Sequence, residues 1–144
     1  MSLFSSLNIS ATGLTAERVR LDIISNNIAN METTRTQNGG PYVRKVVSFE
    51  ENINEHINNF GKSKEKKMQG VKVSSIEDDS VTPLKLVYNP NHPDANSEGY
   101  VTMPNVNPLN EMVDLITASR SYEANVTALN TNKQMFMKAL EIGR

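Results

Sequence analysis

The C-terminal third of this sequence carries a heptad repeat, which constrains the fold more than any other feature. After Asn107-Pro108, nine positions follow one another at alternating spacings of three and four residues, and seven of them are apolar. They are Met112, Leu115, Ser119, Tyr122, Val126, Leu129, Lys133, Phe136 and Leu140. The spacing predicts a helix with one packing seam, capped by Asn107, opened by Pro108 and ended by Gly143. Such a helix measures about 50 Å, more than the width of a compact domain of this size, so it needs partners beyond a small core.

Residues 3–30 carry a second heptad, because leucine or isoleucine recurs at every seventh position. We expect a helix that ends near Asn30, where short amide side chains compete for the backbone. The two helices are predicted to pack as an antiparallel, coiled-coil-like pair. The predicted intramolecular seam consists of Leu7, Leu14, Leu21, Ile28, Met112, Leu115, Tyr122, Val126, Leu129, Phe136 and Leu140.

The middle of the chain has a different character and is predicted to be a small β-rich insertion. Turn-forming residues at 38–41 precede a β-branched run at 42–49, and further short strands are expected at 70–73 and 84–88. Residues 50–60 are predicted to form a short helix, and residues 62–67 an exposed loop. The fold class is therefore mainly α with a β-rich or irregular insertion, residues 31–107, at the far end of a helical inner domain built from residues 1–30 and 108–144.

The composition argues against several classes of protein. A net charge of −1 does not suggest a nucleic-acid partner. No apolar run reaches the roughly 18 residues that span a bilayer, and the N-terminus lacks the basic region of a cleaved signal. Without cysteine there are no disulfides or thiolate metal sites.

We expect no metal site and no enzymatic activity from the remaining polar residues. His56 and His92 lack a second ligand at helical spacing, and the acidic run 77–79 is interpreted as a solvated turn. Nucleophile elbows, phosphate loops and dinucleotide fingerprints are all missing from the sequence. We therefore predict no cofactor and no small-molecule substrate.

The faces of the C-terminal helix that point away from the seam carry few charges. Between Met112 and Asn132 the charged residues are Asp114, Arg120 and Glu123. A solvated helix normally alternates charges on such faces. Two interpretations stay open: a plain helical hairpin with an uncharged surface, or faces that copies of the same protein cover in an assembly.

Several stretches of the sequence resemble the rod and hook axial protein family of the bacterial flagellum. Arg35-Thr36, in place of the Gly-Tyr that rod and hook proteins usually have there, favours the proximal rod subtype. The resemblance rests on Ser25-Asn26-Asn27-Ile28-Ala29-Asn30 with Thr33-Thr34, Gly39-Gly40-Pro41-Tyr42, Tyr88-Asn89-Pro90 with His92-Pro93-Asp94-Ala95-Asn96, Gly99-Tyr100-Val101 with Pro104-Asn105-Val106-Asn107, Glu111-Met112-Val113-Asp114-Leu115-Ile116, and Ser119-Arg120-Ser121-Tyr122-Glu123-Ala124-Asn125.

This resemblance implies a structural subunit of the basal-body proximal rod that polymerises helically and transmits motor torque for motility. The implied partners are copies of itself, other rod proteins and the flagellar type III export apparatus, with a location outside the cytoplasm and no cleaved signal. The signature residues expected in subunit packing are Asn26, Asn27, Ala29, Asn30, Ala118, Ser121, Ala124, Asn125 and Ala128. The alternative hypothesis is a small secreted helical-hairpin effector or adaptor that binds a foreign protein through its amphipathic ends.

Overall fold

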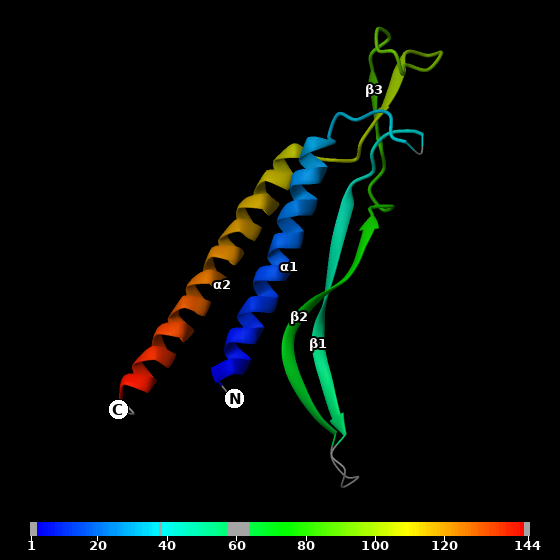
Figure 1. The fold of residues 1–144 in the computed structure, drawn as a ribbon. Coiled ribbons are helices and arrows are strands. Elements are labelled where there is room, and N and C mark those ends of the chain that lie inside the picture. Colours follow the sequence, from blue (N-terminus) through cyan, green and yellow to red (C-terminus); the bar gives the residue numbers. More distant parts are fainter. Residues whose placement is uncertain (1–2, 38, 58–63, 143–144) are drawn as a thin grey trace.

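Two long helices and two antiparallel hairpins make up the fold (Figure 1). The computed structural model describes residues 3–37, 39–57 and 64–142. The elements in chain order are α1 (Leu3–Ala29), β1 (Lys45–Ile57), β2 (Lys64–Asp78), β3 (Lys85–Tyr88), β4 (Tyr100–Met103) and α2 (Pro108–Ile142). This arrangement confirms the predicted fold class, a long helix at each end of the chain with a small β insertion between them.

The predicted helix boundaries at the insertion are confirmed by their capping bonds. Asn107 Oδ1 accepts a hydrogen bond from the backbone N–H of Leu109 at 3.1 Å, and Pro108 is the first residue of α2. This satisfies one of the amide groups left unpaired at a helix start. At the end of α1, the side-chain amide of Asn30 bonds the carbonyl of Asn26 at 2.9 Å. Gly143, predicted to end α2, lies outside the described residues.

The helices run antiparallel, and Figure 1 shows the two chain termini at the same end of the pair. Asn27 Nδ2 donates to Glu111 Oε2 at 3.2 Å, and a Cβ added to Gly13 would lie 3.1 Å from Asn125 Oδ1. Two heptads separate these two contacts along each helix, in opposite directions. The helices therefore keep one register over at least four turns.

The buried side of α2 differs from a purely apolar heptad. Most of the predicted seam residues are half-buried, but Met112 and Leu140 are 52% and 56% exposed, which places both outside the buried strip. The residues before Met112 and Ser119, namely Glu111 and Ala118, are both fully buried. A straight helix repeats every 3.6 residues rather than 3.5, so small or polar neighbours can rotate into a seam that the apolar residues alone suggest.

The β1–β2 hairpin lies beside α1 and runs along it, as Figure 1 shows. The Oγ1 of Thr12 accepts a hydrogen bond from the N–H of Val71 at 3.3 Å, and the Arg20 guanidinium stacks 5.9 Å from the centre of the Phe49 ring. The prediction that the whole insertion sits at the far end of the helices is wrong for this hairpin. Only the short β3–β4 hairpin projects beyond that end.

The helix predicted at residues 50–60 is wrong for the part that the structure describes. Residues 50–57 belong to β1, while 58–60 lie outside the described residues. Residues 64–67, predicted as a loop, begin β2, and 62–63 lie outside the described residues. The strand register places Glu50 opposite Lys72, and their side chains form an ion pair at 2.8 Å. Such opposite charges favour cross-strand pairing, which the helical spacing of the isoleucines concealed.

None of the helices in the described ranges has a stretch long and apolar enough to cross a membrane.

Candidate functional site

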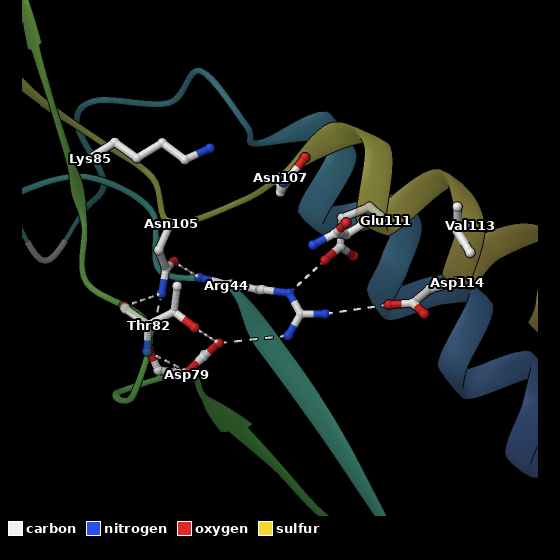
Figure 2. A pocket seen from close by; sticks show the side chains of 10 residues that line it. Arg44, Asp79, Thr82, Lys85, Asn105, Asn107, Glu111, Val113 and Asp114 are labelled. Carbon is white, nitrogen blue, oxygen red and sulfur yellow. Dashed lines mark hydrogen bonds and ion pairs between the residues drawn. The ribbon is translucent and has the colours of Figure 1, made fainter.

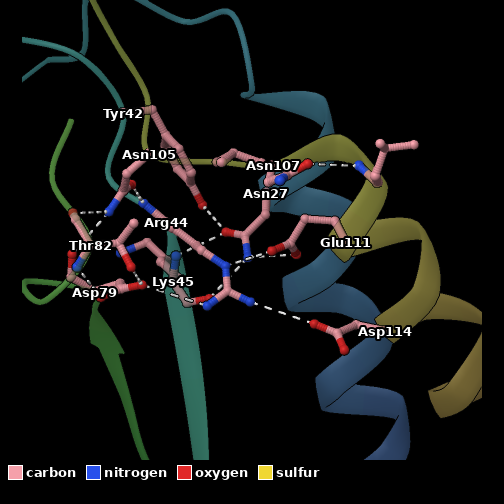
Figure 3. Close-up of polar contacts among 12 residues, drawn as sticks. Asn27, Tyr42, Arg44, Lys45, Asp79, Thr82, Asn105, Asn107, Glu111 and Asp114 are labelled. Carbon is pink, nitrogen blue, oxygen red and sulfur yellow. Dashed lines mark hydrogen bonds and ion pairs between the residues drawn. The ribbon is translucent and has the colours of Figure 1, made fainter. Parts of the chain in front are cut away.

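A buried polar cluster joins the helix pair to the β1–β2 hairpin, and we call it the joint. It consists of Asn27, Tyr42, Arg44, Asn105 and Glu111. Figure 3 shows these side chains converging from α1, α2, the segment before β1 and the segment before α2. Segments far apart in the sequence therefore meet at one point.

Arg44 is the charged centre of the joint. Its Nε donates to Glu111 Oε1 at 2.5 Å, and its terminal nitrogens lie 3.7 Å from Asp79 Oδ2 and 3.6 Å from Asp114 Oδ2. Burial by itself would lower the pKa of Arg44, but the hydrogen bond and charge of Glu111, helped by Asp79 and Asp114, raise it overall. The guanidinium therefore stays charged, and the Glu111 side chain, only 1% exposed, has a fixed counter-charge.

Asn27 uses its whole side-chain hydrogen-bonding capacity within the joint. Its Nδ2 donates to the carbonyl of Lys45 at 2.9 Å and to Glu111, and its Oδ1 accepts from the N–H of Lys45 at 2.9 Å and from Tyr42 Oη at 2.8 Å. A fully bonded amide can be buried without the cost of an unmet donor or acceptor. Asn27 therefore fixes the start of β1 against both helices.

Tyr42 completes this end of the joint as a neutral donor. Burial, followed by the negative charges of Asp78 and Glu111, raises the pKa of the Tyr42 hydroxyl. The proton that bonds Asn27 therefore stays in place well above neutral pH.

Asn105 connects the joint to the segment after β2. Its Oδ1 accepts from the N–H of Arg44 at 2.8 Å, and its Nδ2 donates to the carbonyls of Asp79 and Thr82 at 3.0 and 2.9 Å. Asp79 in turn accepts from the N–H groups of Val81 and Thr82, and the bonds from Thr82 are the main reason its pKa is lowered. The sequence suggested that Asp79 belongs to a solvated acidic turn. Its bonds to the segment after β2 show that it also has a structural role.

A recess of about 510 Å³ opens between the first turns of α2 and the segment from β2 to β3 (Figure 2). Asp114 and Val113 line it from α2, and Lys85 lines it from the opposite side. The Nζ of Lys85 donates to the carbonyl of Val106 at 2.6 Å. Arg44 and Glu111 of the joint contribute to the wall of the recess.

A smaller contact fastens the β3–β4 connection to the segment after α1. Asp94 Oδ2 accepts from Thr34 Oγ1 at 2.8 Å, and Asp94 Oδ1 forms an ion pair with Arg35. The hydrogen bond from Thr34, followed by the charge of Arg35, outweighs desolvation and lowers the pKa of Asp94.

The side chains of the joint hold parts of the chain together. Its one carboxylate, Glu111, already accepts hydrogen bonds from Arg44 and Asn27, so it is not free to act as a base. Within residues 3–37, 39–57 and 64–142, no three histidine, cysteine or acidic side chains are arranged to hold a metal ion. What this cluster can do is fix the relative positions of the helices and the β1–β2 hairpin.

The signature residues predicted for subunit packing fall into two groups. Asn27 and Ala118 are 1% and 0% exposed and are buried by their own chain, so the assignment of these two to contacts with other subunits is corrected. The others keep some exposure, from half-buried to fully exposed: Asn26, Ala29, Asn30, Ser121, Ala124, Asn125 and Ala128.

Sequence reasoning missed the roles of Tyr42, Arg44, Asn105 and Glu111. Three of the four lie in the family-like stretches quoted above, which was the available signal, whereas Arg44 follows such a stretch by two residues. Nothing in the local sequence pairs Arg44 with Glu111, because 67 positions separate them.

Comparison with known proteins shows similarity to flagellar rod proteins over the full chain. A family model described as "Flagella basal body rod protein" matches residues 7–36, and one described as "Flagellar basal body rod FlgEFG protein C-terminal" matches residues 97–142. The two matches cover α1 from residue 7 onward and all of α2, with the segments that face the insertion.

Curated relatives named "Flagellar basal-body rod protein FlgC" align along their whole length. The one from Bacillus subtilis (strain 168) is 55% identical, with 100% of both chains covered. The one from Borreliella burgdorferi is 50% identical over 99% of this chain and 98% of its own. The one from Escherichia coli O157:H7 is 40% identical, again with 100% of both chains covered.

Proposed function

Because this chain belongs to the family of flagellar basal-body rod proteins FlgC, we propose that it is a structural subunit of the rod. In this role it polymerises helically with copies of itself and other rod proteins and transmits motor torque for motility. The full-length identity to rod proteins is the observation that carries the proposal. The same identity favours this function over the secreted effector or adaptor, and no catalytic step is required of the chain.

The joint suits a subunit that bears torque. A shaft twists internally if its helical and β parts can rotate against each other. Arg44 hydrogen-bonds Glu111 on α2 and forms longer ion pairs with Asp114 and Asp79, while Asn27 bonds the start of β1 to α2. Charge-assisted bonds of this kind fix direction as well as distance.

Residues 1–30 and 108–144 would form the inner domain of the rod subunit, and residues 31–107 its outer part. The exposed small residues on α2, Ala124 and Ala128, would allow close approach of a neighbouring helix. The half-buried Ser121 and Asn125 lie beside them and would border the same contact.

We also propose export by the flagellar type III apparatus to a location outside the cytoplasm. The first sixteen residues carry no charge, and α1 begins within them. In a strain that lacks this apparatus, the chain should stay in the cytoplasmic fraction. Normal recovery outside the cytoplasm would contradict this route.

Swimming of a strain whose own gene is replaced tests the function. Leu129→Asp puts a charge into the half-buried strip between the helices and should abolish rod assembly and swimming, whereas Leu129→Met should swim. Ala124→Glu and Ala128→Glu should leave the helical content of the purified chain unchanged and still abolish swimming. Normal swimming of all three charged variants would refute the proposal.

A further inference from the structure

We propose that the recess at the start of α2 receives the C-terminal end of α2 from a second copy of this chain. This inference rests on the proposed polymerisation and names one contact that would produce it. It combines two surface features at opposite ends of the same helix, the recess and the last two turns of α2.

The recess offers both signs of charge on separate walls. Asp114 is about half exposed and lies 3.6 Å from Arg44, which is more tightly bonded to Glu111. Lys85, on the other wall in Figure 2, donates to a neutral carbonyl oxygen and forms no ion pair with a carboxylate in the described part of the chain. A group that carries one cation and one anion would complement this pair of walls.

The last two turns of α2 carry such a group. Lys138 Nζ lies 2.7 Å from Glu141 Oε2, and both side chains are more than 60% exposed. When this end of one copy lies in the recess of another, Lys138 would face Asp114 of the receiving copy, and Glu141 would face its Lys85. The negative end of a helix dipole would then also approach the positive start of the receiving helix.

Apolar side chains accompany the charges at both ends. Leu109, Val113 and Val81 are 72%, 62% and 91% exposed around the start of α2 and the β2–β3 segment. Met137, Leu140 and Ile142 are likewise exposed beside the Lys138–Glu141 pair. An apolar contact next to a complementary charge pair is the usual composition of a specific interface.

The proposed contact joins two different surfaces of the chain, an arrangement that can build a polymer. The two surfaces lie toward opposite ends of a 35-residue helix, and about 36 Å separates Asp114 from Lys138. When copies stack end to end, this contact leaves one surface of each kind free, and it produces an open helical polymer if the rotation between copies does not close a ring.

Disulfide cross-linking tests this contact directly, because the chain has no cysteine of its own. Val113→Cys is placed in one tagged copy of the purified full chain and Met137→Cys in a second copy with another tag. These positions are about 36 Å apart on one helix, so a disulfide between them must join two chains. We expect the mixed disulfide to form. Its yield should be at least tenfold lower when Thr127→Cys replaces Val113→Cys. Absence of the mixed disulfide, or a yield no greater than that of disulfides between two Val113→Cys copies or between two Met137→Cys copies, would overturn the proposal.

A charge reversal checks the polarity of the contact. The double variant Lys138→Glu/Glu141→Lys keeps the net charge and the ion pair but presents the wrong sign to each wall of the recess. It should lower the yield of the mixed disulfide about tenfold. The matched variant Arg120→Glu/Glu123→Arg, which reverses an exposed pair in the middle of α2, should leave that yield unchanged. Equal yields from the two double variants would also overturn the proposal. The cross-linking assay uses purified chains and is therefore independent of the swimming test. If the mixed disulfide is absent but Leu129→Asp still abolishes swimming, the docking is refuted and the rod function is retained.

Discussion

The two ends of the helix pair are held together in different ways. At the joint end, Asn27, Glu111 and Ala118 are fully buried, and the polar groups of the first two are bonded. At the free end, which we define as residues 5–14 of α1 and 125–142 of α2, none of the described residues is fully buried. The subunit is therefore fixed internally at one end, whereas the other end leaves surface exposed that neighbours in the proposed rod would cover.

Of the changes considered, loss of Glu111 at the joint end should lower the free energy of unfolding most. Glu111→Ala leaves the partly buried Arg44 guanidinium without its closest partner, which should lower the free energy of unfolding by up to about 3 kcal/mol. Glu123→Ala removes one half of an exposed ion pair on the same helix and should cost about 0–1 kcal/mol. Chemical denaturation of both variants measures the difference. Equal costs would show that the joint end has no special role.

A smaller effect is expected where β2 approaches α1. Gly70 has φ +97°, and an added Cβ would lie 2.1 Å from Thr12 Oγ1. Gly39 has φ +80° with nothing within 4 Å of an added Cβ. Gly39→Ala should therefore cost about 1–2 kcal/mol for the backbone alone, and Gly70→Ala should cost more, because Thr12 must also move. Thermal unfolding compares them, and a Gly70→Ala cost at or below that of Gly39→Ala would show that the hairpin is not held closely on α1.

The smallest effect concerns the contact of Asp94 with Thr34 and Arg35. Because the pKa of Asp94 is lowered in the folded chain, the stability from this contact is present above the ordinary aspartate range of about pH 4 and is lost as the pH falls through the lowered value. NMR titration should show Asp94 titrating below that range. Thr34→Val should bring its pKa back toward the ordinary value. An unshifted titration in the unmodified chain would contradict the observed bond.

Local periodicity was enough to predict the two helices, their capping residues near Asn30 and Asn107, and their antiparallel pairing. It failed for residues 50–57, because the spacing of Ile53 and Ile57 fits a helix as well as a strand, and only the partner strand decides between them. It also missed Arg44 and Glu111, since a buried ion pair between distant positions leaves no periodic signal. Polar residues in a seam become recognisable only when their partners are known.

Amide hydrogen exchange along both helices tests the central claim most directly. If the joint fixes one end of the pair, the slowest exchange in the isolated chain should lie within residues 20–28 of α1 and 111–120 of α2. Protection should then fall steadily toward residues 130–142. Uniform protection along both helices, or the slowest exchange at the free end, would contradict it.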